Sequence, residues 1–128
     1  MPKVRSIFLV EDDQDDLEFF ITALRNIDDV WLSDVAVNGR EAIEKLRFMP
    51  VLPSIIFVDY YMPIMNGLGF LKEKAKYPLI KNVPVVMLSS SFEKREEALR
   101  NGGKIFILKR HDENSLRAEV EQAVNMGL

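Results

Sequence analysis

Charged and hydroxyl side chains stand at the ends of four short apolar runs in this sequence. Glu11 and Asp12 follow the first run, Asp59 follows the second, and Ser89 and Lys109 follow the third and fourth. Carboxylates held a few ångströms apart in a partly desolvated site repel one another, so a group of three needs a cation or a proton. Mg²⁺ suits such ligands and can hold phosphoryl oxygens, while an aspartate beside it can act as a nucleophile. A lysine and a hydroxyl can bind the remaining oxygens, so we expect a phosphoryl-transfer site if the fold brings these residues together.

The apolar runs themselves are predicted to be strands. Each is about four residues long and rich in β-branched or aromatic residues, which is typical of strands buried on both faces. They are Ile7–Val10, Ile55–Val58, Val85–Leu88 and Ile105–Leu108. A fifth segment, Val30–Val37, mixes polar residues into its pattern, as an edge strand does.

Apolar stripes with a spacing near 3.6 residues predict helices between and after these strands. The stripes are Leu17, Phe20, Ile21, Leu24 and Ile27; Ala42, Ile43 and Leu46; Phe70, Leu71 and Ala75; Ala98 and Leu99; and Leu116, Val120, Ala123 and Val124. Asn38, with Glu41 three residues later, predicts the start of the second helix. Ser90 or Ser91 predicts the start of the fourth helix, and Asp112 that of the fifth.

The expected order is therefore a strand followed by a helix, five times over. Such alternation indicates an α/β fold with a five-stranded parallel sheet that is covered on both faces. Ligands of these sheets bind at the carboxyl ends of the strands, near the point where the strand order reverses. The candidate residues stand at those ends, so the predicted fold and the predicted chemistry agree.

Composition limits the classes of function. The chain has 128 residues, which fits one domain, and its net charge of −3 speaks against a nucleic-acid-binding protein. It has no cysteine, which excludes disulfides and thiolate metal sites and suits a reducing compartment. The run Ile7–Val10 is too short for a signal peptide or a membrane span. We expect a cytoplasmic protein with a single domain, residues 1–128, and no output domain or membrane segment.

Four ordered segments resemble a known family. They are Phe8–Asp13, Ile56–Gly67, Val83–Ser89 and Phe106–Lys109. Together they are similar to the receiver domains of two-component response regulators, in particular the single-domain, chemotaxis-regulator type, and the resemblance extends from about Val4 to Val124. It implies a flavodoxin-like, doubly wound (βα)5 fold with strand order 2-1-3-4-5.

The resemblance implies a metal site. Glu11 and Asp12 match the acidic pair that binds Mg²⁺ in the family, directly or through water. Asp59 matches the phosphoacceptor, which is also a metal ligand, and the backbone carbonyl of Tyr61 matches the third protein ligand. In the family, the residue at the position of Tyr61 also tunes how long the phosphoryl group persists.

The resemblance also implies a switch. Ser89 matches the hydroxyl residue that engages the phosphoryl group, Lys109 the lysine that pairs with it, and Phe106 the aromatic residue that turns inward behind Ser89. One residue departs from the family pattern, because Arg110 stands where a proline usually follows the lysine, often after a cis bond. A cis bond before a non-proline residue costs about 2.5–4 kcal/mol, so we expect a trans bond or a strained cis bond there.

In such a protein the phosphoryl donor is a phosphohistidine of a sensor histidine kinase or a histidine phosphotransfer protein. The downstream target is another protein, which the sequence does not name, and it reads the surface of the fourth helix, fifth strand and fifth helix. Slow self-dephosphorylation is expected, and turnover as an enzyme is not.

Simpler explanations exist for single residues. Asp13, Asp15 and Asp16 suit a solvated acidic turn before a helix, since acids favour helix N-termini. Ser89 could belong to a serine cap, Phe106 could be a core residue, and the only histidine, His111, is interpreted as a surface residue.

Three other functions are alternatives to the receiver. A phosphatase of the haloacid dehalogenase type needs an acid two residues after the nucleophile, where this chain has Tyr61. A flavodoxin-like cofactor site would meet the acidic loop at residues 11–16, which repels phosphate. A receiver fold that serves only as a protein-binding adaptor usually loses an acidic ligand, the acceptor or the lysine, and this sequence keeps them all.

Overall fold

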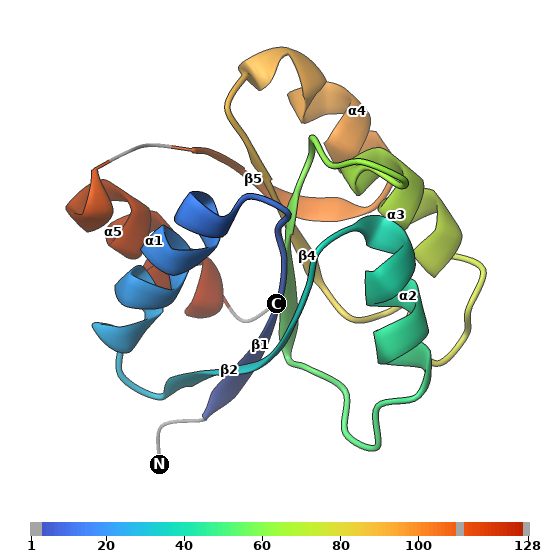
Figure 1. Cartoon of the computed structure of the whole chain (residues 1–128), viewed down its shortest axis with the longest axis horizontal. Helices are drawn as coiled ribbons and strands as arrows, with labels where there is room; N and C mark the ends of the chain where they lie inside the picture. Colours follow the sequence, from blue (N-terminus) through green and yellow to red (C-terminus); the bar gives the residue numbers. More distant parts are fainter. Residues whose placement is uncertain (1–3, 110–111, 127–128) are drawn as a thin grey trace.

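The computed structural model describes residues 4–109 and 112–126, which form one parallel sheet with helices on both faces (Figure 1). The strands lie in the order β2-β1-β3-β4-β5, and all neighbouring pairs are parallel. Their bounds are β1 Arg5–Val10, β2 Val30–Ala36, β3 Ile55–Asp59, β4 Val85–Ser89 and β5 Gly103–Leu108. The predicted fold class, flavodoxin-like topology and strand order are confirmed.

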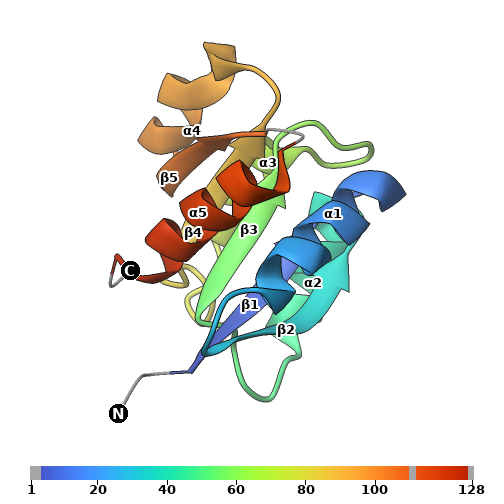
Figure 2. The same cartoon turned by 90° about the vertical axis from the view of Figure 1, so that its left-hand side faces the viewer.

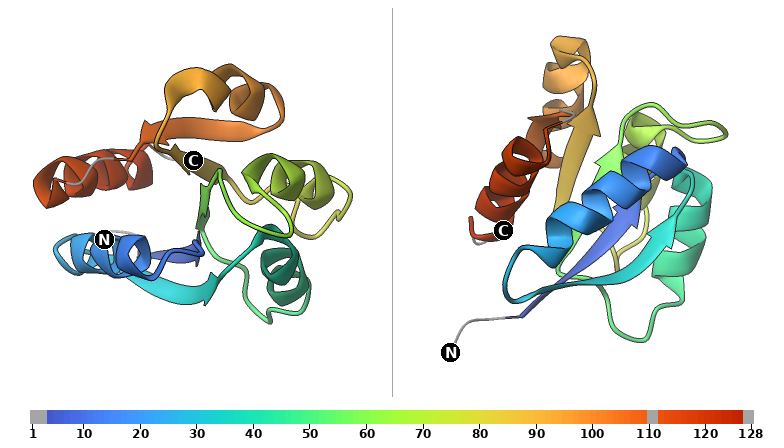
Figure 3. Two further views of the ribbon diagram at one scale, coloured as in Figure 1. Left: turned by 45° about the horizontal axis from the view of Figure 1, so that its top comes forward. Right: turned by 60° about the vertical axis from the view of Figure 1, so that its left-hand side comes forward.

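The helices cover the sheet in two groups. Their bounds are α1 Gln14–Arg25, α2 Gly39–Arg47, α3 Gly67–Lys74, α4 Arg95–Arg100 and α5 Glu113–Val124, and a 3-10 turn, η1, spans Phe92–Lys94. Helices α1 and α5 lie side by side on one face, and α2, α3 and α4 lie on the other (Figures 2 and 3). None of the helices in the described ranges is long and apolar enough to cross a membrane.

The apolar runs of β1, β3 and β4 form buried strands because alternate residues enter two separate cores. Ile7 and Leu9 of β1 belong to the core beneath α1 and α5, whereas Phe8 and Val10 belong to the core beneath α2, α3 and α4. All four side chains are fully buried. A continuous apolar run therefore fits a strand that is covered on both sides. The mixed segment β2 lies at the edge of the sheet, as its polar residues predict. The run in β5, predicted to be buried on both faces, is only partly buried because β5 lies at the other edge of the sheet.

Short polar caps fix where the helices begin. The side chain of Asn38 accepts a hydrogen bond from the Glu41 N–H at 2.9 Å, and Asp112 accepts one from the Asn114 N–H at 3.0 Å. The expectation for the fourth helix needs a correction. Ser91 caps η1, and α4 begins only at Arg95, because the chain first makes a 3-10 turn after β4.

Candidate functional site

The register of the sheet places the strand ends next to one another. Asp59 at the end of β3 pairs with Leu88 of β4, and Ser89 pairs with Leu108 of β5. The N–H of Lys109 then donates to the carbonyl of Ser89 at 2.7 Å, so the residue after β5 is held beside the end of β4. In-register parallel pairing therefore brings together residues that are far apart in sequence.

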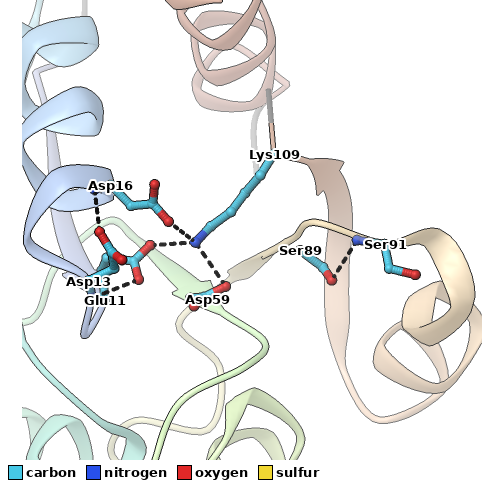
Figure 4. A network of polar contacts seen from close by, with 7 residues as sticks. All are labelled: Glu11, Asp13, Asp16, Asp59, Ser89, Ser91 and Lys109. Atoms are coloured by element: carbon cyan, nitrogen blue, oxygen red, sulfur yellow. Dashed lines mark hydrogen bonds and ion pairs between the residues drawn. The ribbon is translucent and has the colours of Figure 1, made fainter. Parts of the chain in front are cut away.

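The Lys109 ammonium group is the centre of this cluster (Figure 4). Its Nζ lies 2.7 Å from Glu11 Oε1, 2.8 Å from Asp16 Oδ2 and 3.1 Å from Asp59 Oδ1. An ammonium group has three N–H donors, and here three carboxylates surround it. The side chains come from the loop after β1, from α1, from the end of β3 and from the residue that follows β5.

Burial determines the electrostatics of the cluster. Glu11 is 2% exposed and Asp59 is 5% exposed. Burial raises the pKa of Glu11 to about 7, although Lys109 opposes the shift, and burial likewise raises the pKa of Asp59. Burial by itself lowers the pKa of Lys109, but hydrogen bonds to Asp16 and Glu11 outweigh it, so the pKa stays above its usual value. Two carboxylates thus occupy a site that disfavours their charge.

The same acids fit a divalent cation. Glu11, Asp12 and Asp59 each offer an oxygen, and these ligand atoms lie within 4.8 Å of one another. Two of the residues are buried and Asp12 is exposed, so the cluster has a solvent-facing side. Carboxylate oxygens in this number suit Mg²⁺, which keeps several of its waters, and a cation would relieve the repulsion between the buried acids. The residues that the sequence predicted as carboxylate ligands therefore lie together.

Tyr61 lies beside this cluster. Its side chain is 44% exposed, and it lines an open cavity of about 350 Å³ together with Asp12, Met62, Pro63 and Asn66. Its hydroxyl donates to Glu93 Oε1 at 3.0 Å, which directs the ring toward η1. The role of its backbone carbonyl as a metal ligand stays a prediction.

Ser89 lies in the site, but its side chain contacts Ser91 and not Asp59. It is fully buried, and its hydroxyl accepts a hydrogen bond from the N–H of Ser91 at 3.2 Å. In Figure 4 the hydroxyl faces Ser91 rather than Asp59. The Ser89 O–H is not the donor in this bond, so it can donate to a group on Asp59 once the side chain turns toward it.

Phe106 lies away from the carboxylates, on the face of the sheet that α4 covers. It is partly buried against that core, and its ring centre is 6.1 Å from that of Phe92. This position suits both packing and the predicted switch role. Arg110 and His111 lie outside the described residues.

Asp16 is the site residue that sequence reasoning missed, because an acid in the first turn of a helix is ordinarily a solvated helix-terminal residue. It does stand in the first turn of α1, where its N–H donates to the capping Asp13 side chain at 3.0 Å. The available signal was its spacing. A helix that starts directly after β1 directs one of its first-turn side chains toward the carboxyl ends of the strands.

Comparison with known families agrees with this geometry. The sequence model described as "Response regulator receiver domain" matches residues 7–121. The chain belongs to the response regulator receiver family. Accepting a phosphoryl group is the general role of this family, and its members include the chemotaxis receivers that follow.

Curated relatives carry this receiver within proteins of different length. The protein-glutamate methylesterase/protein-glutamine glutaminase 1 of Carboxydothermus hydrogenoformans is 37% identical over 98 residues, 73% of this chain and 27% of that protein. The chemotaxis protein CheY of Thermotoga maritima is 37% identical over 76 residues, 58% of this chain and 60% of that protein. The chain spans only 12–27% of the length of the methylesterase above and of two further relatives, a sensor histidine kinase and a second methylesterase.

Solved structures share the whole fold. The response regulator domain of Thermotoga maritima CheB superposes with a TM-score of 0.83 and 27% identity, covering 98% of this chain and 96% of that one. The phosphorylated cyanobacterial phytochrome response regulator RcpA superposes with a TM-score of 0.81 and 27% identity, covering 93% and 90%.

Proposed function

We propose that this receiver accepts a phosphoryl group on Asp59 from a phosphohistidine donor, with Mg²⁺ bound, and signals by protein contact. The observation that supports this most is the position of Asp59, which is buried, 3.1 Å from the Lys109 ammonium group and within the Glu11–Asp12–Asp59 cluster. An acid at this point has a cationic partner on one side and a metal-ligand set on the other. In this proposal residues 1–128 act as one receiver domain in the cytoplasm.

The transfer follows from the residues of the site. An Asp59 carboxylate oxygen attacks phosphorus, the bond from phosphorus to the histidine nitrogen breaks, and its electron pair stays with the imidazole. Lys109, which already donates to Asp59, then donates to a phosphoryl oxygen. Glu11, Asp12, Asp59 and the Tyr61 carbonyl would hold Mg²⁺. When bound, the metal supplies positive charge that stabilises the phosphoryl oxygens in the transition state.

Signalling depends on Ser89 and Phe106. A phosphoryl oxygen on Asp59 would offer the Ser89 O–H a charged acceptor, and the hydroxyl, which now accepts from the Ser91 N–H, would turn to donate to it. We infer that η1 moves with Ser91 and that Phe106 repacks in the space left beside α4. The changed surface of α4, β5 and α5 is then read by a downstream protein. Water later hydrolyses the acyl phosphate, so the protein is a switch and not a turnover enzyme.

The donor in this proposal is a sensor histidine kinase or a histidine phosphotransfer protein. The open cavity beside Asp12 and Tyr61 supports this, because it gives a phosphohistidine an approach to the exposed side of the acidic cluster.

The test is phosphorylation of the purified chain by acetyl phosphate, followed by intact mass with Mg²⁺ and with EDTA. We expect a gain of one phosphoryl group that is lost in base or hydroxylamine, as an acyl phosphate is, that needs Mg²⁺ and that is absent in Asp59→Asn. Asp12→Asn should lose most of the reaction while keeping the fold. A chain that takes up no phosphoryl group from acetyl phosphate or from a phosphohistidine protein, and that binds no Mg²⁺, would instead be a receiver-fold adaptor.

A further inference from the structure

Asp16 stands apart from the other two carboxylates around Lys109. Glu11 and Asp59 belong to the group whose ligand atoms lie within 4.8 Å of one another, and Asp16 does not. Yet Asp16 Oδ2 is as close to the ammonium nitrogen as Glu11 is, at 2.8 Å against 2.7 Å, while Asp59 is the most distant at 3.1 Å. Of the three acids, Asp16 alone contacts the lysine without belonging to the metal-ligand group.

The position of Asp16 is fixed by its helix. Asp13 caps α1 by accepting the Asp16 N–H at 3.0 Å, and the Leu17 N–H donates to the Asp13 carbonyl at 2.9 Å. Further along the helix, Phe20 and Leu24 are buried in the core beneath α1 and α5. The first turn of α1 is therefore anchored, and the short Asp16 side chain has little freedom to follow a moving lysine.

Lys109 has to change partners during the proposed reaction. When Asp59 becomes an acyl phosphate, the N–H that points to Asp59 must pass to a phosphoryl oxygen, and Glu11 must also serve the metal. A flexible lysine side chain loses conformational freedom when it is held in place, and a fixed counter-ion reduces that loss at the reactive step. Asp16 is the partner that can stay in place throughout.

We propose that Asp16 is the positioning residue of Lys109: it holds the ammonium group by a contact that neither the metal nor the phosphoryl group needs. This inference rests on the proposed function. It assigns to Asp16 an orienting role and no contact with the substrate. It also explains why an acid in a partly exposed first turn points inward to a lysine instead of outward to water.

A simpler role is that Asp16 only adds negative charge at the N-terminus of α1, where acids are stabilising. Asp15 provides the matched control, because it is exposed, stands in the same helical turn and carries the same charge. If helix or surface charge were the whole effect, Asp15→Asn and Asp16→Asn would behave alike.

The replacement is not expected to unfold the chain. Glu11, Asp16 and Lys109 line a cavity of about 30 Å³, together with apolar side chains of α1, β4 and α5. This is room for a water molecule, which can hydrogen-bond an N–H that has lost its carboxylate. A bound water is replaceable and orients the ammonium group less firmly than an anchored carboxylate.

The experiment measures the rate of phosphorylation by acetyl phosphate at saturating Mg²⁺ and, separately, the Kd for Mg²⁺ by titration calorimetry. We expect Asp16→Asn to lower the rate about tenfold, as loss of an orienting partner does, and to change the Kd by less than about threefold. Asp15→Asn should stay within about twofold of the wild type in both, and Asp16→Glu should recover part of the rate.

Two further comparisons decide the mechanism. In a Lys109→Met background, Asp16→Asn should have no additional effect on the residual rate, because its target is gone. In the metal-free protein, the ¹⁵N-edited ammonium signal of Lys109 should exchange with water faster in Asp16→Asn than in the wild type. A wild-type rate in Asp16→Asn, an equal loss in Asp15→Asn, or a full additional loss in the Lys109→Met background would each overturn the inference. Failure of the wild type itself to react at Asp59 would refute the proposed function instead.

Discussion

The hydroxyl of Tyr60 donates to Glu97 Oε1 at 2.9 Å and so joins the residue after Asp59 to helix α4. Tyr60 is 4% exposed, and burial, with the bond to Glu97, raises its pKa to about 12. Helix α4 is short and has no side-chain cap at Lys94, its N-cap residue. This hydrogen bond is therefore a specific tie between the acceptor loop and a helix that the switch is proposed to move.

We expect Tyr60→Phe to lower the free energy of unfolding by about 1.5 kcal/mol, because it removes the hydroxyl that donates to the Glu97 carboxylate. Hydrogen exchange of the α4 amides should become faster. Tyr61→Phe is the matched control, since its hydroxyl bonds to Glu93 at an exposed position, and it should change stability by less than about 0.5 kcal/mol. If chemical denaturation shows the same loss of unfolding free energy in both variants, the Tyr60–Glu97 hydrogen bond contributes no more to stability than the exposed one.

Gly67 lies where the backbone of the acceptor loop leaves no room for a side chain. A Cβ there would lie 2.9 Å from the carbonyl oxygen of Asp59 and 2.7 Å from Met87 Sδ. Gly67→Ala should therefore lower the free energy of unfolding by about 1–3 kcal/mol and slow phosphorylation, because the Asp59 backbone must shift.

Gly69 supplies the comparison within the same helix. A Cβ at Gly69 would meet Met65 Cγ at 3.0 Å, the middle of a flexible side chain. Alanine also favours a helix over glycine by about 0.5–1 kcal/mol, so Gly69→Ala should be close to neutral. If thermal unfolding shows that Gly69→Ala is less stable than Gly67→Ala, the close contacts of Gly67 do not exclude a side chain there.

Asp59→Asn should stabilise the Mg²⁺-free protein while it abolishes the proposed function. The replacement removes one charge from a buried group of acids but leaves Lys109 its contacts with Glu11 and Asp16. The gain at pH 7 should be about 0.5–2 kcal/mol, the size that single stabilising substitutions commonly give. Added Mg²⁺ should raise the melting temperature of the wild type more than that of the variant. A less stable Asp59→Asn protein in EDTA would mean that the ion pair with Lys109 outweighs the repulsion.

Lys74, which is not part of the acidic cluster, should make the free energy of unfolding depend on pH. It is 6% exposed, donates from Nζ to the Lys81 carbonyl at 2.8 Å, and has its pKa lowered to about 8 by burial, with Lys104 adding to the effect. Between pH 8 and 10 the unfolded chain keeps the proton on Lys74 and the folded chain loses it. The unfolded state then binds more protons, so stability rises with pH in this window.

Lys74→Met removes this titration and keeps a side chain of similar length. The wild type should gain about 2 kcal/mol relative to Lys74→Met between pH 8 and 10, measured by urea unfolding at each pH. The lost hydrogen bond to Lys81 adds an offset that does not change with pH. A difference between the two proteins that stays constant over this range would contradict the assigned shift.

Most of the fold can be predicted from patterns of residues that are close in sequence. The runs at Ile7–Val10 and Ile55–Val58 predict buried strands because a strand with apolar residues on both faces must be covered by helices on both sides. The helix caps of Asn38 and Asp112 can be predicted because each is a contact between residues close in sequence. The predicted start of α4 is too early, because a serine cap does not show whether an α-helix or a 3-10 turn follows it.

The sequence by itself determined a five-stranded parallel α/β fold and the acids that gather at the strand ends, because residue type, spacing and the alternation of strands and helices leave few alternatives. Its resemblance to receiver domains implied the strand order. Only the tertiary structure decided which of these polar and charged groups contact one another. It placed Asp16 on Lys109, turned Ser89 toward Ser91 and tied Tyr60 to Glu97. Such contacts form only when separate elements are positioned accurately relative to one another. Those positions are set when the helices pack against the two faces of the sheet.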